Sequence, residues 1–90
     1  MTIRMNISPN FVQFTNNVEV TTVKGRTVRE CIDDLIKQFP ALKEVMFDNK
    51  GNIYRYFDIY INNESSYPDE LDKPVKDGDV LHVVMLVHGG

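Results

Sequence analysis

The residues with the clearest potential for chemistry stand at the end of the chain, where His88 precedes Gly89 and Gly90. Glycine has no Cβ, so two glycines can adopt almost any backbone angles and pass through a slot too narrow for a side chain. A free carboxylate on Gly90 could then enter the active site of another protein. The sequence therefore suggests a carrier whose working group is its own terminus. The alternative is an ordinary frayed chain end.

The other residues that could do chemistry give weaker signals. Cys31, the only cysteine, falls on the apolar stripe of a predicted helix, which indicates a buried and inert thiol. His82 and His88 are six residues apart in an extended segment, a separation of about 20 Å that is too long for a shared metal ion. No nucleophile and base, phosphate loop or paired carboxylates can be recognised. We expect neither an enzyme nor a metal or cofactor site.

Composition indicates one small globular domain. The 90 residues are 42% hydrophobic and 26% charged, which suits a folded chain near the size where a single core suffices. The net charge of −3 and the scattered Lys and Arg residues argue against nucleic acid as a partner. There is no secretory signal and no apolar run of about 18 residues, so we expect neither export nor a membrane partner. A single cysteine cannot form an internal disulfide. Together with the lack of a secretory signal, this cysteine content predicts a cytoplasmic protein.

The first half of the chain predicts two strands and a helix. Residues 2–7 alternate as a half-buried strand, and residues 18–23 are β-branched and predict a second strand, antiparallel to the first. Thr27-Val28-Arg29-Glu30 has the form of a capping box and starts an amphipathic helix. Pro40 ends this helix, and residues 40–47 could add a short second one.

The second half predicts the remaining strands. Residues 55–62 alternate again, residues 63–69 form a polar loop, and a brief strand or turn lies near Leu71. Asp77-Gly78 makes a tight turn before a final strand over residues 80–87. One helix on one face of a mixed sheet is an α+β architecture, in which we expect the first and last strands to pair in parallel. The expected core residues are Ile3, Met5, Val18, Val20, Val28, Cys31, Ile32, Leu35, Ile36, Phe39, Phe57, Ile59, Ile61, Leu81 and Val83.

This element order, with the segment Asp58-Ile59-Tyr60-Ile61-Asn62, resembles the ubiquitin-like sulfur-carrier proteins of the ThiS/MoaD family. The most specific point is the spacing, in which Asp77-Gly78-Asp79 is followed by nine residues and then by the terminal diglycine. The resemblance spans essentially the whole chain. It implies a ubiquitin-like β-grasp fold, a mixed four- to five-stranded sheet packed on one main helix. Residues 1–87 would form the domain and residues 88–90 a flexible tail.

Within the family, the chain looks more like the molybdopterin synthase small subunit, or like carriers for cysteine and homocysteine synthesis, than like the shorter thiamin-type carriers. The resemblance implies that a ThiF/MoeB-type enzyme uses ATP to adenylate the carboxylate of Gly90. A sulfur nucleophile then displaces AMP and leaves a thiocarboxylate, which donates sulfur to a biosynthetic enzyme. Gly89 and His88 would enter the active site of the partner, and the free carrier would be a monomer.

A docking patch beside the tail follows from the alternation of the last strand. Its even-numbered residues should face away from the helix and lie beside Tyr60. These outward residues are His82, Val84 and Leu86. An apolar and aromatic strip of this kind predicts a partner surface, although surfaces routinely expose single apolar residues.

Two other functions stay open at this stage. One is a ubiquitin-like protein modifier that forms isopeptide conjugates through the same carboxylate. The other is a β-grasp interaction module in which Gly89-Gly90 is incidental.

Overall fold

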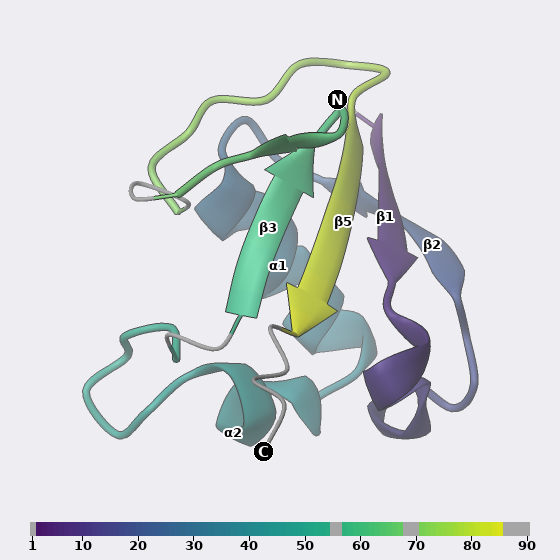
Figure 1. The fold of residues 1–90 in the computed structure, drawn as a ribbon, viewed down its shortest axis with the longest axis vertical. Coiled ribbons are helices and arrows are strands. Elements are labelled where there is room, and N and C mark those ends of the chain that lie inside the picture. Colours follow the sequence, from purple (N-terminus) through teal and green to yellow (C-terminus); the bar gives the residue numbers. More distant parts are fainter. Residues whose placement is uncertain (1, 55–56, 68–70, 86–90) are drawn as a thin grey trace.

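The computed structural model describes residues 2–54, 57–67 and 71–85 as one sheet with helices against it. The elements are β1 (Thr2–Ile7), the 3-10 helix η1 (Pro9–Phe14), β2 (Val20–Lys24), α1 (Val28–Gln38), α2 (Leu42–Met46), β3 (Phe57–Ile61), β4 (Glu64–Ser65) and β5 (Val80–Met85). The strand order is β2-β1-β5-β3-β4, and α1 lies across one face of the sheet (Figure 1). The structure confirms the predicted α+β class and the mixed β-grasp sheet on one main helix.

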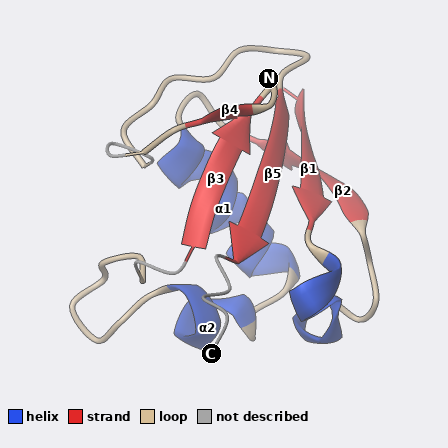
Figure 2. Ribbon diagram, viewed as in Figure 1, coloured by secondary structure: helices blue, strands red, loops and turns tan. Residues whose placement is uncertain are grey.

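The two strands nearest the ends of the chain lie together in the middle of the sheet. β1 and β5 pair in parallel, with Met5 opposite Leu81, as the sequence predicts. β2 pairs antiparallel with β1, and β3 pairs antiparallel with both β5 and β4 (Figure 2). The connection from β1 to β5 therefore includes α1, which covers the face that the apolar residues of the central strands share.

Helix α1 begins and ends where the local sequence predicts. The hydroxyl of Thr27 accepts a hydrogen bond from the N–H of Glu30 at 3.2 Å, which satisfies one free amide of the first turn. The Glu30 carboxylate accepts from the N–H of Arg26 at 2.9 Å, one residue earlier than in a standard capping box. The helix ends at Gln38, because Pro40 disfavours the α conformation of the residue before it.

The core lies between α1 and the sheet, and one predicted member is wrong. Val20 is 53% exposed, and Val18 is only partly buried. The register places Val23 opposite Ile3, and both are fully buried, so the odd-numbered residues of β2 face the helix. The observed core residues are Ile3, Met5, Ile7, Val23, Val28, Cys31, Ile32, Leu35, Leu42, Met46, Phe57, Ile59, Val75, Leu81 and Val83.

Two connections differ from or extend the predictions. The short strand β4 falls inside the expected polar loop, while Leu71 lies in a turn. The expected turn after α2 is present, with the Asp48 carboxylate accepting hydrogen bonds from the N–H groups of Lys50 and Asn52. In the described part of the chain, no helix has the length and apolar character needed to cross a membrane.

Candidate functional site

The strand that leads to the diglycine is held firmly in the middle of the sheet. β5 pairs with β1 on one side and with β3 on the other. Leu81 and Val83 are fully buried against the helix side. Gly90, Gly89, His88 and Leu86 lie outside the described residues, so their roles stay predictions. The described part of the site is therefore β5, the strand that precedes these residues in the sequence.

A row of side chains crosses the face of the sheet that is turned away from α1, with one residue from each strand. In strand order the row is Val20, Asn6, His82, Tyr60 and Ser65, which the pairing registers place directly opposite one another. His82 and Tyr60 are partly exposed neighbours, as the sequence predicts. Val84 lies two residues further along β5, also partly exposed, opposite Asp58 of β3. The structure thus brings together three of the four predicted docking residues.

The row has a polar pair at its centre. The Nδ2 atom of Asn6 lies 3.0 Å from Nε2 of His82, so the amide can donate to an unprotonated ring nitrogen. The Oδ1 atom of Asn6 is buried and has no hydrogen-bond partner in the described structure. A shallow hollow of about 510 Å³ lies beside this pair, bordered also by Arg4, Glu19 and Val20.

Three members of the row, Val20, Asn6 and Ser65, were not among the predicted docking residues. For Val20 the local pattern is ambiguous, because Val18 and Val20 indicate one inward face of β2 and Val23 indicates the other. The pairing of Val23 with the buried Ile3 places Val20 on the open side. For Asn6 the alternation of β1 predicts an outward side chain, but its contact with His82 depends on a register that joins residues 76 positions apart. Such a register cannot be obtained from local periodicity.

The beginning of β5 is fixed by hydrogen bonds around Asp79. Its carboxylate accepts from the Asn62 side-chain amide at 3.0 Å and from the N–H of Lys76 at 2.9 Å. These two bonds, the Asn62 amide first, hold the pKa of Asp79 below its ordinary value of 3.8. The Asn62 amide oxygen also accepts from the N–H of Val80 at 2.9 Å. Gly78 completes the turn with φ of +91°, a left-handed conformation that favours glycine.

Cys31 has the properties of a structural residue. Its side chain is fully buried on α1 and forms no disulfide. Burial, together with the nearby carboxylates of Asp34 and Glu30, raises the pKa of the thiol to about 11. The thiol is therefore protonated near neutral pH and a poor nucleophile. Within residues 2–54, 57–67 and 71–85, no group of three or more His, Cys, Asp or Glu residues could hold a metal ion.

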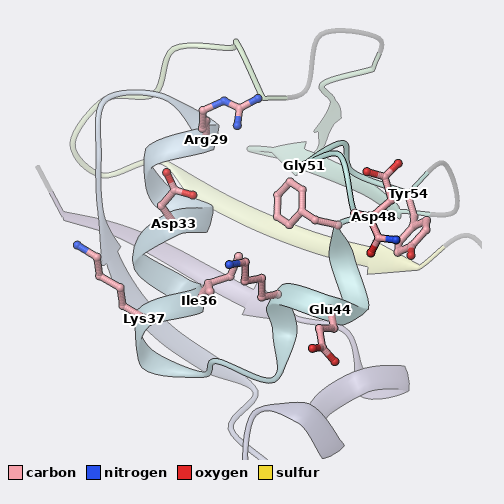
Figure 3. Close-up of a pocket in the computed structure, with 11 residues that line it drawn as sticks. Arg29, Asp33, Ile36, Lys37, Glu44, Asp48, Gly51 and Tyr54 are labelled. Atoms are coloured by element: carbon pink, nitrogen blue, oxygen red, sulfur yellow. The ribbon is translucent and has the colours of Figure 1, made fainter.

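A second hollow, of about 990 Å³, lies on the helix side of the molecule, between α1 and the segment from α2 to Tyr54 (Figure 3). Its apolar lining residues are Ile36, Phe47 and Tyr54. Its charged lining residues are Arg29, Lys37 and Lys43 against Asp33, Glu44 and Asp48. The opposite charges are equal in number, so the hollow shows no preference for an anion or a cation. It lies away from the open face that carries the row.

Known proteins resemble the chain over its whole length. A family model described as the ThiS family matches residues 10–90. A chain in the crystal structure of the Amycolatopsis orientalis BexX/CysO complex is 28% identical, with a TM-score of 0.86 over 98% of this chain and 99% of that chain. The crystal structure of SAMP1 from Haloferax volcanii is 22% identical, with a TM-score of 0.88 over 100% of both chains.

A more distant likeness is a chain in the protein–protein complex of subunits 1 and 2 of the molybdopterin-converting factor from Helicobacter pylori. It is 23% identical, with a TM-score of 0.62 over 100% of both chains. At these identities, the likeness to the Helicobacter chain and to the Haloferax protein shows a shared fold and nothing more. Among curated proteins there is no match to this chain.

Proposed function

The chain belongs to the ThiS family of sulfur carriers, which are substrates of adenylating enzymes and not catalysts, and we propose that it carries sulfur as a thiocarboxylate on Gly90. In this cycle a ThiF/MoeB-type enzyme joins the Gly90 carboxylate to the AMP portion of ATP and releases pyrophosphate. A sulfur nucleophile attacks the acyl carbon, and AMP leaves with the electron pair of the broken C–O bond. The thiocarboxylate then gives its sulfur to a biosynthetic enzyme that makes an amino acid such as cysteine or homocysteine, or molybdopterin.

The observation that carries this proposal is the central position of β5. Because β5 is hydrogen-bonded on both sides, the end of this strand is a fixed point relative to the open face. β5 ends at Met85, five residues before Gly90. Five extended residues span roughly 17 Å, which is enough to reach a buried active site from a docked domain. The proposal takes Gly90 as the terminal residue of the working carrier, whether native or exposed by trimming.

The glycines supply access and the carrier supplies no catalytic group. A partner that binds ATP must bring its α-phosphate next to the acyl carbon, and side chains at positions 89 and 90 would obstruct that approach. We assign Gly89 and His88 to the segment that enters the partner with Gly90. In this proposal the partner supplies the catalytic groups, as expected for a member of a family of substrates of adenylating enzymes.

The docking surface in this proposal is the open face around His82. Tyr60, Val84 and, beyond the described residues, Leu86 would contact the adenylating enzyme. Tyr60 and Val84 are partly exposed, so docking can remove further apolar area from water. Val20 extends the surface toward the β2 edge.

Intact mass spectrometry tests the proposal directly. The purified carrier is incubated with ATP, a candidate ThiF/MoeB-type enzyme from the same genome and a sulfide source. We expect a mass increase equal to the difference between sulfur and oxygen, and none without ATP. Gly90→Ala should fold normally and stay unmodified, while Lys76→Ala, in the loop before β5, should be modified like the wild type. Normal modification of Gly90→Ala would refute the assignment of Gly90.

The second candidate function is a protein modifier. The fold likeness to SAMP1, named small archaeal modifier protein 1, is the observation that favours it. Both functions begin with the same adenylation, but a modifier forms isopeptide bonds to lysine. Lysine-linked conjugates in cell extract, without a free thiocarboxylate, would support the modifier. Unchanged function after deletion of Gly89 and Gly90 would instead indicate an interaction module.

A further inference from the structure

The sheet has two edge strands, and they differ in length. An edge strand presents unpaired backbone N–H and C=O groups that another chain can use to add a strand. β4 contains two residues, which leaves little edge for pairing. β2 contains five residues and is rich in β-branched side chains, so it is the edge at which strand addition is favourable.

The register identifies which backbone groups of β2 point away from the sheet. The N–H of Ile7 donates to the carbonyl of Glu19 at 2.8 Å, which makes these two residues a hydrogen-bonded pair. Hydrogen-bonded pairs alternate with non-hydrogen-bonded pairs along an antiparallel ladder. Val20, Thr22 and Lys24 therefore direct their backbone groups outward, away from β1.

Two side chains of α1 occupy these outward groups. The Nε2 atom of Gln38 donates to the carbonyl oxygen of Thr22 at 2.9 Å. The amide oxygen of Gln38 accepts from the Thr21 hydroxyl at 2.8 Å, which fixes the direction of the amide. The Oδ2 atom of Asp34 accepts from the N–H of Lys24 at 3.0 Å. Asp34, which the sequence presents only as a polar residue of the helix, thus has a specific partner on the sheet.

We propose that Asp34 and Gln38 form an edge cap that prevents β2 from pairing with β2 of a second copy of this chain. The segment 20–24 is self-complementary in an antiparallel register centred on Thr22. In that register Thr22 faces its own copy and Val20 faces Lys24. The pairing would use the Thr22 carbonyl and the Lys24 N–H, the two groups that the cap occupies. The cap and a second copy compete for the same atoms.

Sedimentation velocity measures the effect of removing the cap. Asp34→Ala combined with Gln38→Ala should lower the dimer dissociation constant at least about tenfold relative to wild type, since each copy loses two competing hydrogen bonds. Gln13→Ala combined with Asp33→Ala is the matched control. It removes the same residue types and the same charge from exposed positions outside the cap, and should sediment as the wild type does. Asp34→Asn keeps an acceptor for Lys24 and should also stay close to wild type.

A third substitution locates the dimer contact. Val20 is 53% exposed, so Val20→Lys should leave the fold intact. In the self-paired register it sets a positive charge directly opposite Lys24, and like charges at opposed positions are destabilising. Added to the Asp34→Ala and Gln38→Ala variant, Val20→Lys should restore the monomer. A dimer that survives this change uses another surface and contradicts the proposal.

Hydrogen exchange tests the cap without dimerisation. In the wild type the Lys24 amide should be protected, and Asp34→Ala should accelerate its exchange about tenfold with no change at Val23, which faces β1. This measurement uses a single substitution and stays informative where the double variant does not fold. A folded double variant that remains monomeric, or a Lys24 amide that exchanges equally fast with and without Asp34, would overturn the proposal.

Discussion

Val20 gives a decisive test of the open face. A Val20 side chain in the core, as the sequence predicts, and one on the open face, as the structure has it, lead to opposite effects of substitution. In the structure its side chain is 53% exposed, in the same row as His82 and Tyr60. Val23, on the same strand, is fully buried and serves as a matched control. Val23→Ala should cost about 2–3 kcal/mol of unfolding free energy, as expected for a truncated core side chain. Val20→Ala should cost less than about 0.5 kcal/mol.

The effect on partner binding follows from the same exposed fraction. Fully burying a valine contributes about 1.5 kcal/mol, and about half of the Val20 side chain is still in water. Docking can therefore gain at most roughly 0.8 kcal/mol, so Val20→Ala should raise the KM of the carrier for its adenylating enzyme by up to about fourfold. Val20→Asp places an unpaired carboxylate in the contact and should raise KM by about 30-fold or more, with kcat nearly unchanged.

The assay combines urea unfolding with initial rates of thiocarboxylate formation at varied carrier concentration. If Val20→Ala destabilises the domain as much as Val23→Ala does, the valine belongs to the core and the register of β2 is wrong. If Val20→Asp folds normally and leaves KM unchanged, the adenylating enzyme does not use this end of the row. Either result would refute the reasoning given for the docking surface.

The remaining predictions concern stability and reactivity. The pKa of Asp79 is lower in the folded state than in the unfolded state, so the ionised carboxylate stabilises the fold at pH values above the unfolded pKa of 3.8. This stabilisation is lost as the pH falls through the folded pKa. Asn62→Ala should flatten the acid dependence of the unfolding free energy in urea titrations, and an unchanged slope would exclude the Asn62 amide as its cause. The Cys31 pKa of about 11 leaves roughly one thiolate in a thousand at about pH 8, so iodoacetamide should label the protein only after unfolding; rapid labelling of the native protein would contradict its burial. Gly25→Ala sets a Cβ 2.7 Å from the Cβ of Glu30 and 2.8 Å from the Cys31 amide nitrogen. This crowding should lower the unfolding free energy, measured in urea, by about 1–3 kcal/mol. An unchanged urea midpoint would mean that the start of α1 can shift freely.

Local signals predicted the parts of the fold that local interactions decide. The hydroxyl of Thr27 and the position of Pro40 set the two ends of α1, and both can be seen in a few consecutive residues. The parallel pairing of the first and last strands followed from the element order and the need to cover one sheet face with one helix. These features do not depend on knowing which side chains meet across the sheet.

The predictions failed or stopped where two distant segments meet. In β2 the valines at positions 18 and 20 indicate one inward face and Val23 indicates the other, and only the pairing with β1 decides between them. The contact between Asn6 and His82 and the cap that Gln38 forms on Thr22 depend likewise on how elements far apart in sequence are placed. Periodicity within one segment carries no information about such contacts.

The central position of β5 also has a consequence for the order in which the domain assembles. Arg4 pairs with Val80 across 76 positions, so the middle of the sheet cannot form from neighbouring segments, and contacts of such long range make folding slow. The hairpin of β1 and β2 and the helix α1 involve nearer residues and can form earlier. The open-face row takes one side chain from every strand, with His82 in its middle, so it exists only after β5 has inserted. An enzyme that must bind this row before it activates the terminus would therefore bind folded domains and not unfolded chains. Only folded copies of the carrier would then be activated.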